Sequence, residues 1–473
     1  MNQVCDTYFF NYDEAYKKAK EQNMISSYQK QICYYDGDVR TDDLENLCSL
    51  PFNNLSQELL LSSNRLPTSI NFAGLSLTQN VKQEIVEVFK KLLTNIVKNK
   101  DELINIMMSE IKSFKLDFNE PLRFYLIGAR QTRVTQYMSK YIANSLKNMK
   151  YDVRFDLNSE FEDMDTFKIM KAIHEYNPHV TININNVNNY HLNDDTFNFI
   201  WFQDPNHKLK NLNKRDLRKR DFIYSLLPMI DELLIEKEIP FERQSFCVDK
   251  ETYKLKDDIK REKKIVFIGS DYEYIIKDKS NSYLKAVELV KDKFYTYGEL
   301  INPAKNPDIC DNFNISQEEL QDIVRYVNRV VSVLWLCKVK SEYSVEIYGW
   351  GWDKYEEIKP YHKGILSAGE EICSVYNSAT FTLAPHPDYT LQQRVLESAA
   401  SGAIPIVYDC RDEVDDSHYD EAVCYYKTFE DLNDILNTKD IIEKEFKKLL
   451  EENSFDFFVK NFLKVINKKK GEI

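Results

Sequence analysis

The stretch of this sequence that most constrains its fold runs from Ala379 to Asp409. It contains an apolar run from Thr380 to Ala384, a short polar loop, a segment of helix length and a second apolar run from Ile404 to Tyr408. Two buried-strand signals joined by one helix form a βαβ unit, and such a unit requires parallel strands. The sequence therefore predicts an α/β fold with a parallel sheet.

Both ends of the helix in this unit carry sequence signals. Thr390 followed by Gln393 matches a capping box, and Gly402 and Pro405 end the helix. The loop 385–389 leads from the carboxyl end of a strand to the helix N-terminus, where backbone N–H groups and the helix dipole favour an anion. Open α/β sheets bind ligands at this edge.

The same helix carries Arg394 and Glu397 three residues apart, on one face. Leu391, Val395 and Ala399 form the stripe that we expect to be buried. From spacing alone, two interpretations of the charged pair remain open. It is a solvated surface pair, which contributes little to stability, or it is part of a binding site.

The run RVLESAASGAIPIV, residues 394–407, resembles the donor-site segment of GT-B glycosyltransferases. This resemblance implies that Glu397 hydrogen-bonds the ribose hydroxyls of a nucleotide sugar. Arg394 further resembles the spore-maturation (CgeB-like) branch. The implied fold class is α/β of the GT-B type, with two Rossmann-like domains facing a cleft and an additional, mostly helical N-terminal region.

Other segments of the second half extend the resemblance. YGWGW at 348–352 resembles the family's Y-G-x-G-W element, and residues 363–365 with the helix after them resemble the part that reads the nucleobase. For Trp350 and Trp352 a position in the core is an open alternative. The donor-binding residues that we expect are Gly269, Gly351, Trp352, Lys363, Ile365, His386, Tyr389, Thr390, Arg394 and Glu397.

The acceptor half is expected to begin near Leu122, where a strand ends in Gly128 and a helix follows. It has no GxGxxG motif, which disfavours a dinucleotide enzyme. Two polar loops at strand ends hold candidates for the base that deprotonates a sugar hydroxyl. Asp204 comes first because it resembles the W-x-x-D-P segment of the CgeB-like branch, although a turn before Pro205 would also explain it. The other candidates are His191, Asp194 and His207.

The stereochemical outcome stays open. Retaining GT-B enzymes often carry a second Glu eight residues before the ribose Glu, and Tyr389 occupies that position here, beside Asp388. Either Asp388 substitutes for it as a catalytic carboxylate, or the enzyme inverts with Asp204 as base, which we favour. No D-x-D pair lies at a strand end, so we expect no metal site. The helix N-terminus, Arg394 and His386 would then stabilise the leaving diphosphate.

Length and composition indicate several domains in one soluble protein. We expect a helical N-terminal extension at 1–118, an acceptor domain at 119–256 and a donor domain with C-terminal bracing helices at 257–473. The formal net charge of −13 argues against general nucleic-acid binding. Nine scattered cysteines are typical of reduced thiols in the cytoplasm. No signal peptide or membrane span is expected. Composition suggests a bacterial source.

The predicted function is that of a hexosyltransferase-type glycosyltransferase. It would move a sugar from a UDP- or GDP-sugar co-substrate to a hydroxyl of a protein or glycan acceptor, without a metal or tightly bound cofactor. Two alternatives share the fold. A nucleotide-sugar 2-epimerase would consume the donor without an acceptor. A catalytically silent adapter would instead bind a protein partner through the N-terminal helical region.

Overall fold

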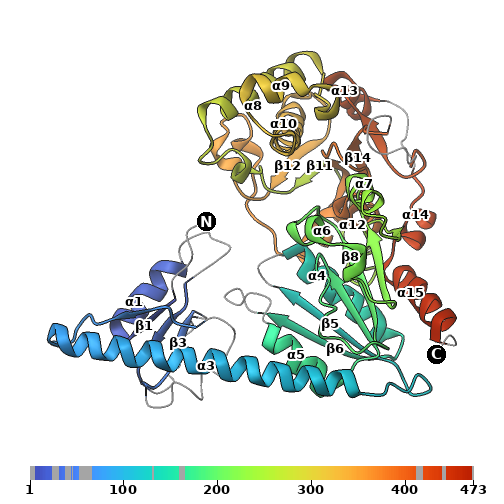
Figure 1. The fold of residues 1–473 in the computed structure, drawn as a ribbon. Helices are drawn as coiled ribbons and strands as arrows, with labels where there is room; N and C mark the ends of the chain where they lie inside the picture. Colours follow the sequence, from blue (N-terminus) through green and yellow to red (C-terminus); the bar gives the residue numbers. More distant parts are fainter. Residues whose placement is uncertain are drawn as a thin grey trace. The chain divides into compact units, whose positions relative to one another are not determined.

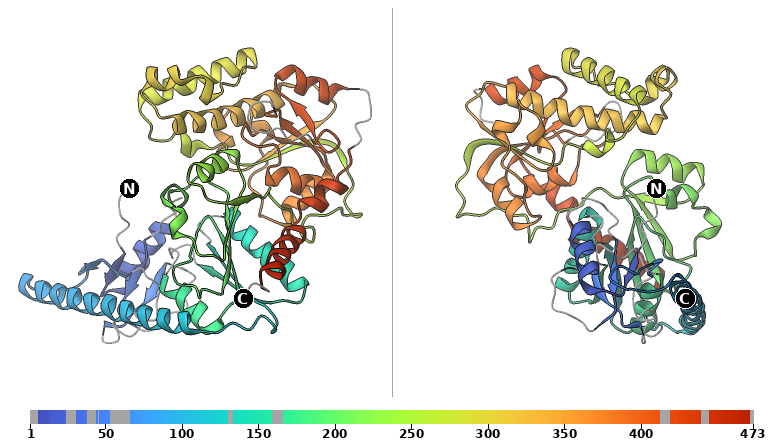
Figure 2. Two further views of the ribbon diagram at one scale, coloured as in Figure 1. Left: turned by 45° about the vertical axis from the view of Figure 1, so that its right-hand side comes forward. Right: turned by 90° about the vertical axis from the view of Figure 1, so that its left-hand side faces the viewer.

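The computed structural model describes residues 6–23, 31–37, 44, 46–52, 66–129, 133–158, 166–411, 419–438 and 444–470 (Figures 1 and 2). The chain divides into two compact units. The first unit holds Met1–Tyr224, Leu233–Glu242 and Phe462–Ile473. The second holds Ser225–Glu232 and Arg243–Asn461.

The N-terminal region contains a small parallel sheet that the sequence analysis did not predict. Its strands have three residues each and follow the order β3-β2-β1-β4, with helix α1 (Tyr12–Asn23) between β1 and β2 in the chain. Three residues are too few to show the alternation that marks a strand. The strands are β1 (Thr7–Phe9), β2 (Cys33–Tyr35), β3 (Leu47–Ser49) and β4 (Ser69–Asn71).

One long helix follows this sheet. Helix α3 (Gln79–Ser113) has 35 residues and joins the two helical segments expected here. The Thr78 side chain caps it by accepting from the Val81 N–H. Phe89 packs into a core with residues of the small sheet. Farther along, Ile111 packs with residues of α5 (Thr166–Tyr176).

The first unit also contains most of a six-stranded sheet with the order β10-β9-β8-β7-β5-β6. The pairs β5–β6, β5–β7 and β7–β8 are parallel, and the predicted strands in this segment are confirmed. Helices α4 (Arg133–Asn148), α6 (His207–Asn211) and α7 (Pro228–Glu236) lie between strands in the chain. The strands are β5 (Arg123–Ala129), β6 (Asp152–Asn158), β7 (Val180–Ile184), β8 (Phe197–Phe202), β9 (Asp221–Ser225) and β10 (Phe241–Arg243).

The second unit is built on a five-stranded parallel sheet with the order β12-β11-β13-β14-β15. The order reverses between β11 and β13, and ligands of open α/β sheets bind beyond the carboxyl ends of the strands at such a switch point. The strands are β11 (Glu262–Ile268), β12 (Ser344–Tyr348), β13 (Ala379–Ala384), β14 (Ile404–Tyr408) and β15 (Cys424–Tyr426). The expected α/β class with two Rossmann-like sheets is confirmed.

Helices cover the second sheet. Helices α8 (Asn281–Tyr297), α9 (Pro307–Phe313), α10 (Gln317–Lys338) and α13 (Phe429–Asn437) share one core with its strands. Helices α11 (Glu370–Ser378) and α12 (Gln393–Ala400) also contact the strands. The C-terminal segment forms two helices, α14 (Lys447–Glu452) and α15 (Phe455–Lys469), which residues 453 and 454 separate. Residues 441–443 lie outside the described ranges.

Candidate functional site

The loop after β13 leads to α12, but the helix begins later than predicted. Its first residue is Gln393, and the N-cap residue Gln392 makes no side-chain capping hydrogen bond. The capping box expected for Thr390 and Gln393 is wrong. The Thr390 hydroxyl lies 3.7 Å from the Cys410 sulfur, and the Gln393 side chain donates to Glu397 instead. The first-turn N–H groups that favour an anion therefore begin near Gln393.

Glu397 is enclosed on α12, with a side chain that is 1 % exposed. Arg394 Nη1 donates to its Oε2 over 2.5 Å, Gln393 Nε2 donates to its Oε1 over 2.8 Å, and Tyr253 also hydrogen-bonds the carboxylate. Burial raises the pKa of Glu397, and the Arg394 charge acts in the opposite direction. The interpretation as a solvated surface pair is wrong, because this carboxylate is buried and held by several donors.

Arg394 differs from its partner because its side chain is 40 % exposed. Burial would lower the pKa of Arg394, but the Glu397 carboxylate raises it above its usual value. The guanidinium therefore stays charged, beside the N-terminus of an eight-residue helix. A guanidinium and helix N–H groups are donors that suit phosphate oxygens.

Asp388 lies in the loop before α12 and is buried. Its two carboxylate oxygens accept hydrogen bonds from Gln321 Nε2 and Arg325 Nε of α10. His386 Nδ1 lies 3.7 Å from Asp388 Oδ2. Burial lowers the pKa of His386 to about 4, although Asp388 raises it. The imidazole is therefore neutral at pH 7, and it is a hydrogen-bonding group rather than a charged one.

Two arginines of α10 reach this edge of the sheet, and the sequence analysis did not identify them. Arg325 binds Asp388, and Arg329 Nη1 donates to the Ser270 carbonyl just after β11. The Arg329 guanidinium carbon lies 3.6 Å from the centre of the Tyr272 ring. Arg329 Nε is buried and has no hydrogen-bond partner among the described residues. The available signal was a pair of arginines four residues apart in a mostly apolar helix.

The glycines at the ends of β11 and β12 allow close packing of the backbone. A Cβ on Gly349 would lie 2.1 Å from the Gly269 carbonyl oxygen. One on Gly351, whose φ is +88°, would lie 2.3 Å from Asp271 Oδ1. Trp352 is fully buried, and its Nε1 donates to the Gly269 carbonyl over 2.6 Å. We expected Trp352 to face the ligand, but its side chain lies in the core. Trp350, in contrast, is 63 % exposed.

Lys363 and Ile365, expected near the nucleobase, line a pocket of about 530 Å³. The pocket lies beside β12 and α11, and the loop between them is anchored by backbone hydrogen bonds from Lys363 to Ile347 and from Gly349 to Gly364. Its lining combines charged, polar and apolar side chains. The other lining residues are Ile259, Lys264, Glu346, Tyr348, Leu366, Glu371, Ser374, Val375 and Ser378.

Tyr389 is buried and faces another part of the second unit. Its hydroxyl donates to Ser245 Oγ over 2.7 Å. Its carbonyl accepts from Gln392 Nε2 over 3.1 Å. The ring is therefore part of the packing that fixes the loop.

In the first unit, Asp204 follows β8 and is exposed. Asn185, which follows the neighbouring strand β7 and has a φ of +56°, donates from Nδ2 to Asp204 Oδ2 over 2.8 Å. Asn185 Oδ1 in turn accepts from the backbone N–H groups of Gln203 and Asp204. One left-handed asparagine thus orients an accessible carboxylate at the carboxyl edge of this sheet.

His191 lies in the polar loop between β7 and β8 but is 1 % exposed. Burial lowers the pKa of His191 to about 4, with smaller effects from Arg218 and Lys112. A base enclosed in this way does not reach an acceptor, which argues against His191 in that role. Asp194 is exposed and pairs with Lys112 over 3.1 Å, and His207 is exposed at the start of α6.

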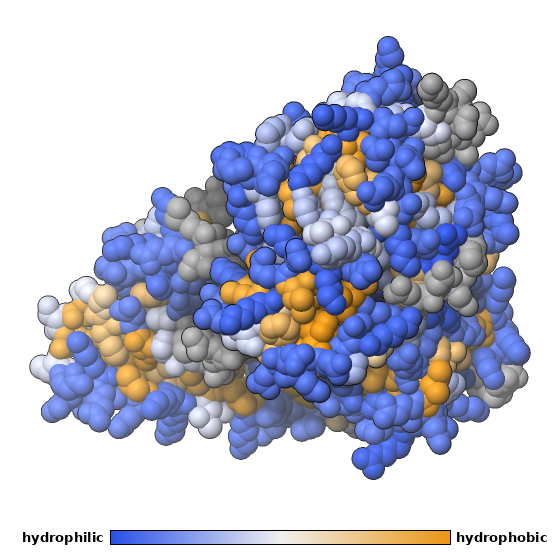
Figure 3. All heavy atoms as spheres, turned by 90° about the horizontal axis from the view of Figure 1, so that it is seen from above, coloured by the Kyte–Doolittle hydropathy of each residue, from blue (hydrophilic) through white to orange (hydrophobic). Residues whose placement is uncertain are grey.

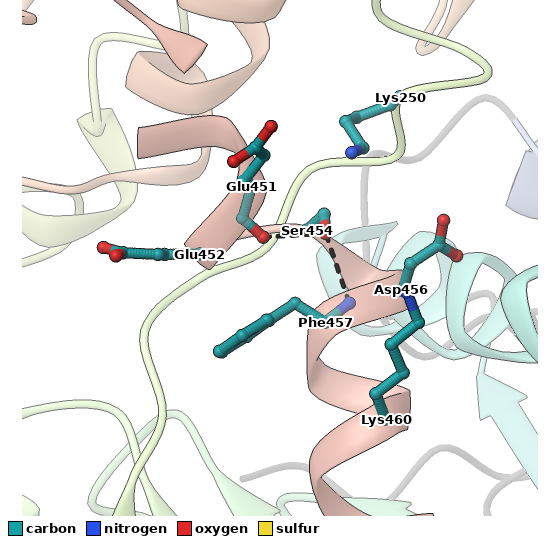
Figure 4. A pocket seen from close by; sticks show the side chains of 7 residues that line it. All are labelled: Lys250, Glu451, Glu452, Ser454, Asp456, Phe457 and Lys460. Atoms are coloured by element: carbon teal, nitrogen blue, oxygen red, sulfur yellow. Dashed lines mark hydrogen bonds between the residues drawn. The ribbon is translucent and has the colours of Figure 1, made fainter. Parts of the chain in front are cut away.

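A separate pocket of about 330 Å³ lies where α14 ends and α15 begins (Figure 4). Ser454 is at this junction, where the Phe457 N–H donates to its hydroxyl over 3.2 Å. The lining residues are Lys250, Glu451, Glu452, Ser454, Asp456, Phe457 and Lys460. None of the predicted site residues contributes to this pocket.

A comparison with protein families now bears on this arrangement. Residues 329–452 match the family model described as "Glycosyl transferase-like". The matched segment covers about a quarter of the chain, from the second half of α10 to α14. The matched segment includes the loop and helix that carry His386, Asp388, Arg394 and Glu397. A comparison with curated proteins found no match.

Among solved structures, the chain is similar to the glycosyltransferase AviGT4, involved in avilamycin A biosynthesis, with 10 % identity and a TM-score of 0.44 over 74 % of this chain and 98 % of that one. It is also similar to the lipopolysaccharide outer core galactosyltransferase WaaB, with 14 % identity and a TM-score of 0.39 over 74 % of this chain and 100 % of that one.

Within the described ranges, no group of three or more His, Cys, Asp or Glu side chains is placed to hold a metal ion. In the same ranges, none of the helices combines the length and the apolar character needed to cross a membrane. Charged groups at the carboxyl edge of the second sheet include the Arg325–Asp388 pair and Arg329, the Arg394–Glu397 pair of α12, and the Lys354–Asp271 pair after β11.

Proposed function

We propose that this protein is a glycosyltransferase that moves a hexose from a UDP- or GDP-sugar to a hydroxyl of a protein or glycan, without a metal ion. One observation carries the proposal. The segment that matches the glycosyl transferase-like family contains the charged cluster at the sheet's switch point. Arg329, His386, Asp388, Arg394 and Glu397 all lie within residues 329–452.

In this proposal the diphosphate binds at the N-terminus of α12. Arg394 is charged and accessible there, and Arg325 and Arg329 add positive charge from α10. Such donors stabilise the charge that develops on the leaving nucleoside diphosphate. In other transferases a metal ion stabilises this charge. Because the arginines and the helix N–H groups take that role here, the proposal includes metal independence.

The contact proposed between Glu397 and a ribose needs a local rearrangement. Gln393, Arg394 and Tyr253 already hydrogen-bond the carboxylate. A carboxylate has about four lone-pair positions, so one acceptor position is left for a ribose hydroxyl. Because Glu397 is 1 % exposed, the Arg394 side chain must rotate away from it before a ribose can approach. Donor binding and reorientation of Arg394 are therefore coupled in this proposal.

For the chemical step we propose inversion with Asp204 as the base. Asp388 is engaged by Gln321 and Arg325, so it is poorly placed to act as a nucleophile. The acceptor hydroxyl gives its proton to Asp204 while its oxygen bonds the anomeric carbon. The bond from that carbon to the diphosphate oxygen breaks, and the nucleoside diphosphate leaves with the electron pair.

The proposal is tested by a thermal-shift screen across nucleotide sugars, followed by mass spectrometry of reactions that contain the stabilising donor and a set of glycan and peptide acceptors. We expect one donor to raise the melting temperature and its sugar to appear on an acceptor. Conversion of the donor to its epimer without an acceptor would support a 2-epimerase instead. No donor binding together with a stable protein partner would support a silent adapter.

The same proposal includes the branch of the family and the cellular compartment of the protein. Arg394, three residues before Glu397, supports the CgeB-like branch, and the cysteines, all free in the described ranges, support a reducing compartment such as the bacterial cytoplasm. The domain roles stay as first proposed, with the acceptor bound by residues 119–256 and the donor by 257–473.

A further inference from the structure

A short basic segment follows Asp204, the proposed base, in the first unit. Residues 207–220 contain seven Lys or Arg residues and one Asp, in a chain whose formal net charge is −13. Hydrophilic residues cover much of the face drawn in Figure 3, so exposed charge alone does not mark a site. The partners of each charge therefore decide what the segment can bind.

Two arginines of the segment are used by the fold itself. Arg218 Nη2 donates to Asp221 Oδ1 over 2.9 Å. The guanidinium carbon of Arg220 lies 4.6 Å from the centre of the Phe197 ring, and Arg220 Nη2 lies 3.6 Å from Asp195 Oδ1. We therefore assign these two charges to the fold rather than to a ligand.

The lysines of the segment lie together with one lysine from elsewhere in the first unit. Lys208 and Lys210 are on α6, and Lys214 follows four residues after Lys210. Lys237, which comes after α7, donates from Nζ to the Lys210 carbonyl over 2.9 Å. Lys214 pairs with Glu238 at 3.8 Å, but the two side chains are 62 and 83 % exposed, so this pair contributes little. We call these four lysines the α6 basic patch.

Lys208 is the member of the α6 basic patch whose charge is left without compensation. Its side chain is half-buried. Within the described ranges, its ammonium group has neither a hydrogen-bond acceptor nor a carboxylate partner. Burial lowers the pKa of Lys208, and no carboxylate raises it. A charge that is removed from water usually lies beside an opposite charge, so this position suits a negatively charged group of a second molecule.

Hydrogen bonds hold the start of α6 in a set position relative to Asp204. Asn185 Nδ2 donates to Asp204 Oδ2 over 2.8 Å, and Asn206 Nδ2 donates to the Asn185 carbonyl over 3.0 Å. The Asn206 side chain also caps α6 by accepting from the backbone N–H groups of Lys208 and Leu209. Because Lys208 follows the base by only four residues, a molecule that presents a hydroxyl to Asp204 has Lys208 within reach.

We propose that the acceptor is an acidic glycan, which binds through a phosphate or carboxylate at the α6 basic patch while it presents a hydroxyl to Asp204. A sugar phosphate or sugar acid carries its charge only a few bonds from several hydroxyl groups, so one sugar residue meets both requirements. The inference rests on the proposed function, because it takes Asp204 as the base. It adds the chemical class of the acceptor and assigns Lys208 to acceptor specificity.

Binding of three labelled oligosaccharides to the full chain, measured by fluorescence anisotropy, tests this proposal. The probes are maltoheptaose and its phosphorylated and carboxymethylated forms. UDP and GDP are present, so that phosphate groups do not bind at the proposed donor site. We expect at least one charged form to bind about tenfold or more tightly than maltoheptaose, and this difference to shrink as salt is raised. The charged form that binds more tightly identifies phosphate or carboxylate as the group that is recognised.

Lys208→Gln should weaken binding of the charged form about tenfold and leave binding of maltoheptaose unchanged. The matched control is Lys98→Gln, since Lys98 is 75 % exposed on α3, outside the α6 basic patch, and pairs with Glu102. It should change neither affinity. Urea denaturation checks the fold of Lys208→Gln, and we expect no loss of stability. A clear loss would show that Lys208 has a structural role and would overturn the proposal.

Three further results would overturn the proposal. The first is equal binding of the three oligosaccharides, and the second is equal weakening of the charged form by Lys208→Gln and Lys98→Gln. The third is tighter binding of an acidic peptide, hepta-glutamate, than of either charged oligosaccharide. A chain that glycosylates a neutral glycan as fast as an acidic one would keep the proposed function and lose this inference. Failure to bind any nucleotide sugar would instead overturn the proposed function itself.

Discussion

Arg394 donates to Glu397 across 2.5 Å within α12, yet the Arg394 side chain is 40 % exposed and that of Glu397 only 1 %. The buried carboxylate therefore binds one side of the Arg394 guanidinium, and the other side of the guanidinium reaches solvent. Together with the proposed function, this relationship predicts two roles for Glu397 that can be separated by experiment, one in holding Arg394 on α12 and one in binding a donor.

Replacing Glu397 by Ala should lower the free energy of unfolding by about 2 kcal/mol, because it removes the buried carboxylate that accepts hydrogen bonds from Gln393 and Arg394. Urea denaturation measures the change. The control is Glu356→Ala, whose side chain is 86 % exposed in a surface pair with Lys359 and which should have almost no effect. Equal stability of wild type and Glu397→Ala would contradict the proposed burial of the charge.

The region of α12 shows what the sequence could and could not predict. The strands on either side were predicted from apolar runs bounded by loops, and β14 has the expected ends. The capping box failed because it forms only where the residues after the N-cap are helical, and residues 391 and 392 are not. Here residues 385–392 stay in a loop whose Tyr389, Thr390 and Leu391 are buried. These tertiary contacts delay the start of the helix.

His191 should make stability depend on pH. Burial lowers its pKa to about 4 from an ordinary value of 6.5, so the unfolded chain binds a proton more readily between these values. The stability is fully present above pH 6.5 and is lost as pH falls towards 4, by about 3 kcal/mol. His386, with a pKa of about 4, acts in the same direction.

The measurement is urea denaturation of wild type and His191→Phe at pH 7 and pH 4.5. The variant should lose less stability between the two pH values, because it has no proton to bind at this position. Identical losses in the two proteins would show that His191 is not a buried neutral base. Neither of its ring nitrogens has a hydrogen-bond partner among the described residues, so Phe removes no such bond found there.

Gly349→Ala should destabilise the second unit more than Gly364→Ala does. Both glycines have positive φ, +131° and +99°, so both variants carry backbone strain of about 1 kcal/mol. At Gly349 the added Cβ would lie 2.1 Å from the backbone carbonyl oxygen of Gly269. At Gly364 the added Cβ would lie in open space. We expect a difference of about 2 kcal/mol in the free energy of unfolding. Equal effects would mean that β11 and β12 do not approach as described.

Asp204→Asn should lower kcat by about a hundredfold or more, because it removes the proposed base. Donor affinity should stay unchanged, because asparagine has a similar size and its amide oxygen can still accept the hydrogen bond from Asn185. Initial rates with the identified donor and acceptor measure the effect. Asp194→Asn is the matched control, since its side chain is 87 % exposed and pairs with Lys112 on the surface. An unchanged kcat, or a product that retains the donor's anomeric configuration, would remove Asp204 as the base.

Some parts of the site gave no signal in a single sequence. Gln321 and Arg325 come from α10, more than sixty residues before the Asp388 that they bind. Such long-range contacts depend on packing that no local pattern encodes. Trp352 illustrates the opposite error, because its position in a glycine-rich strand end resembled a ligand contact while its indole is buried against Gly269.

The most direct test of the account is calorimetric titration of the stabilising nucleotide sugar, and of its nucleoside diphosphate, into wild type and Arg394→Lys. Lysine keeps the positive charge but loses the planar, forked donor geometry. We predict that the variant folds and binds both ligands about tenfold or more weakly, because our proposal places the diphosphate at the N-terminus of α12. Equal affinity in the two proteins would contradict the account and place the donor elsewhere.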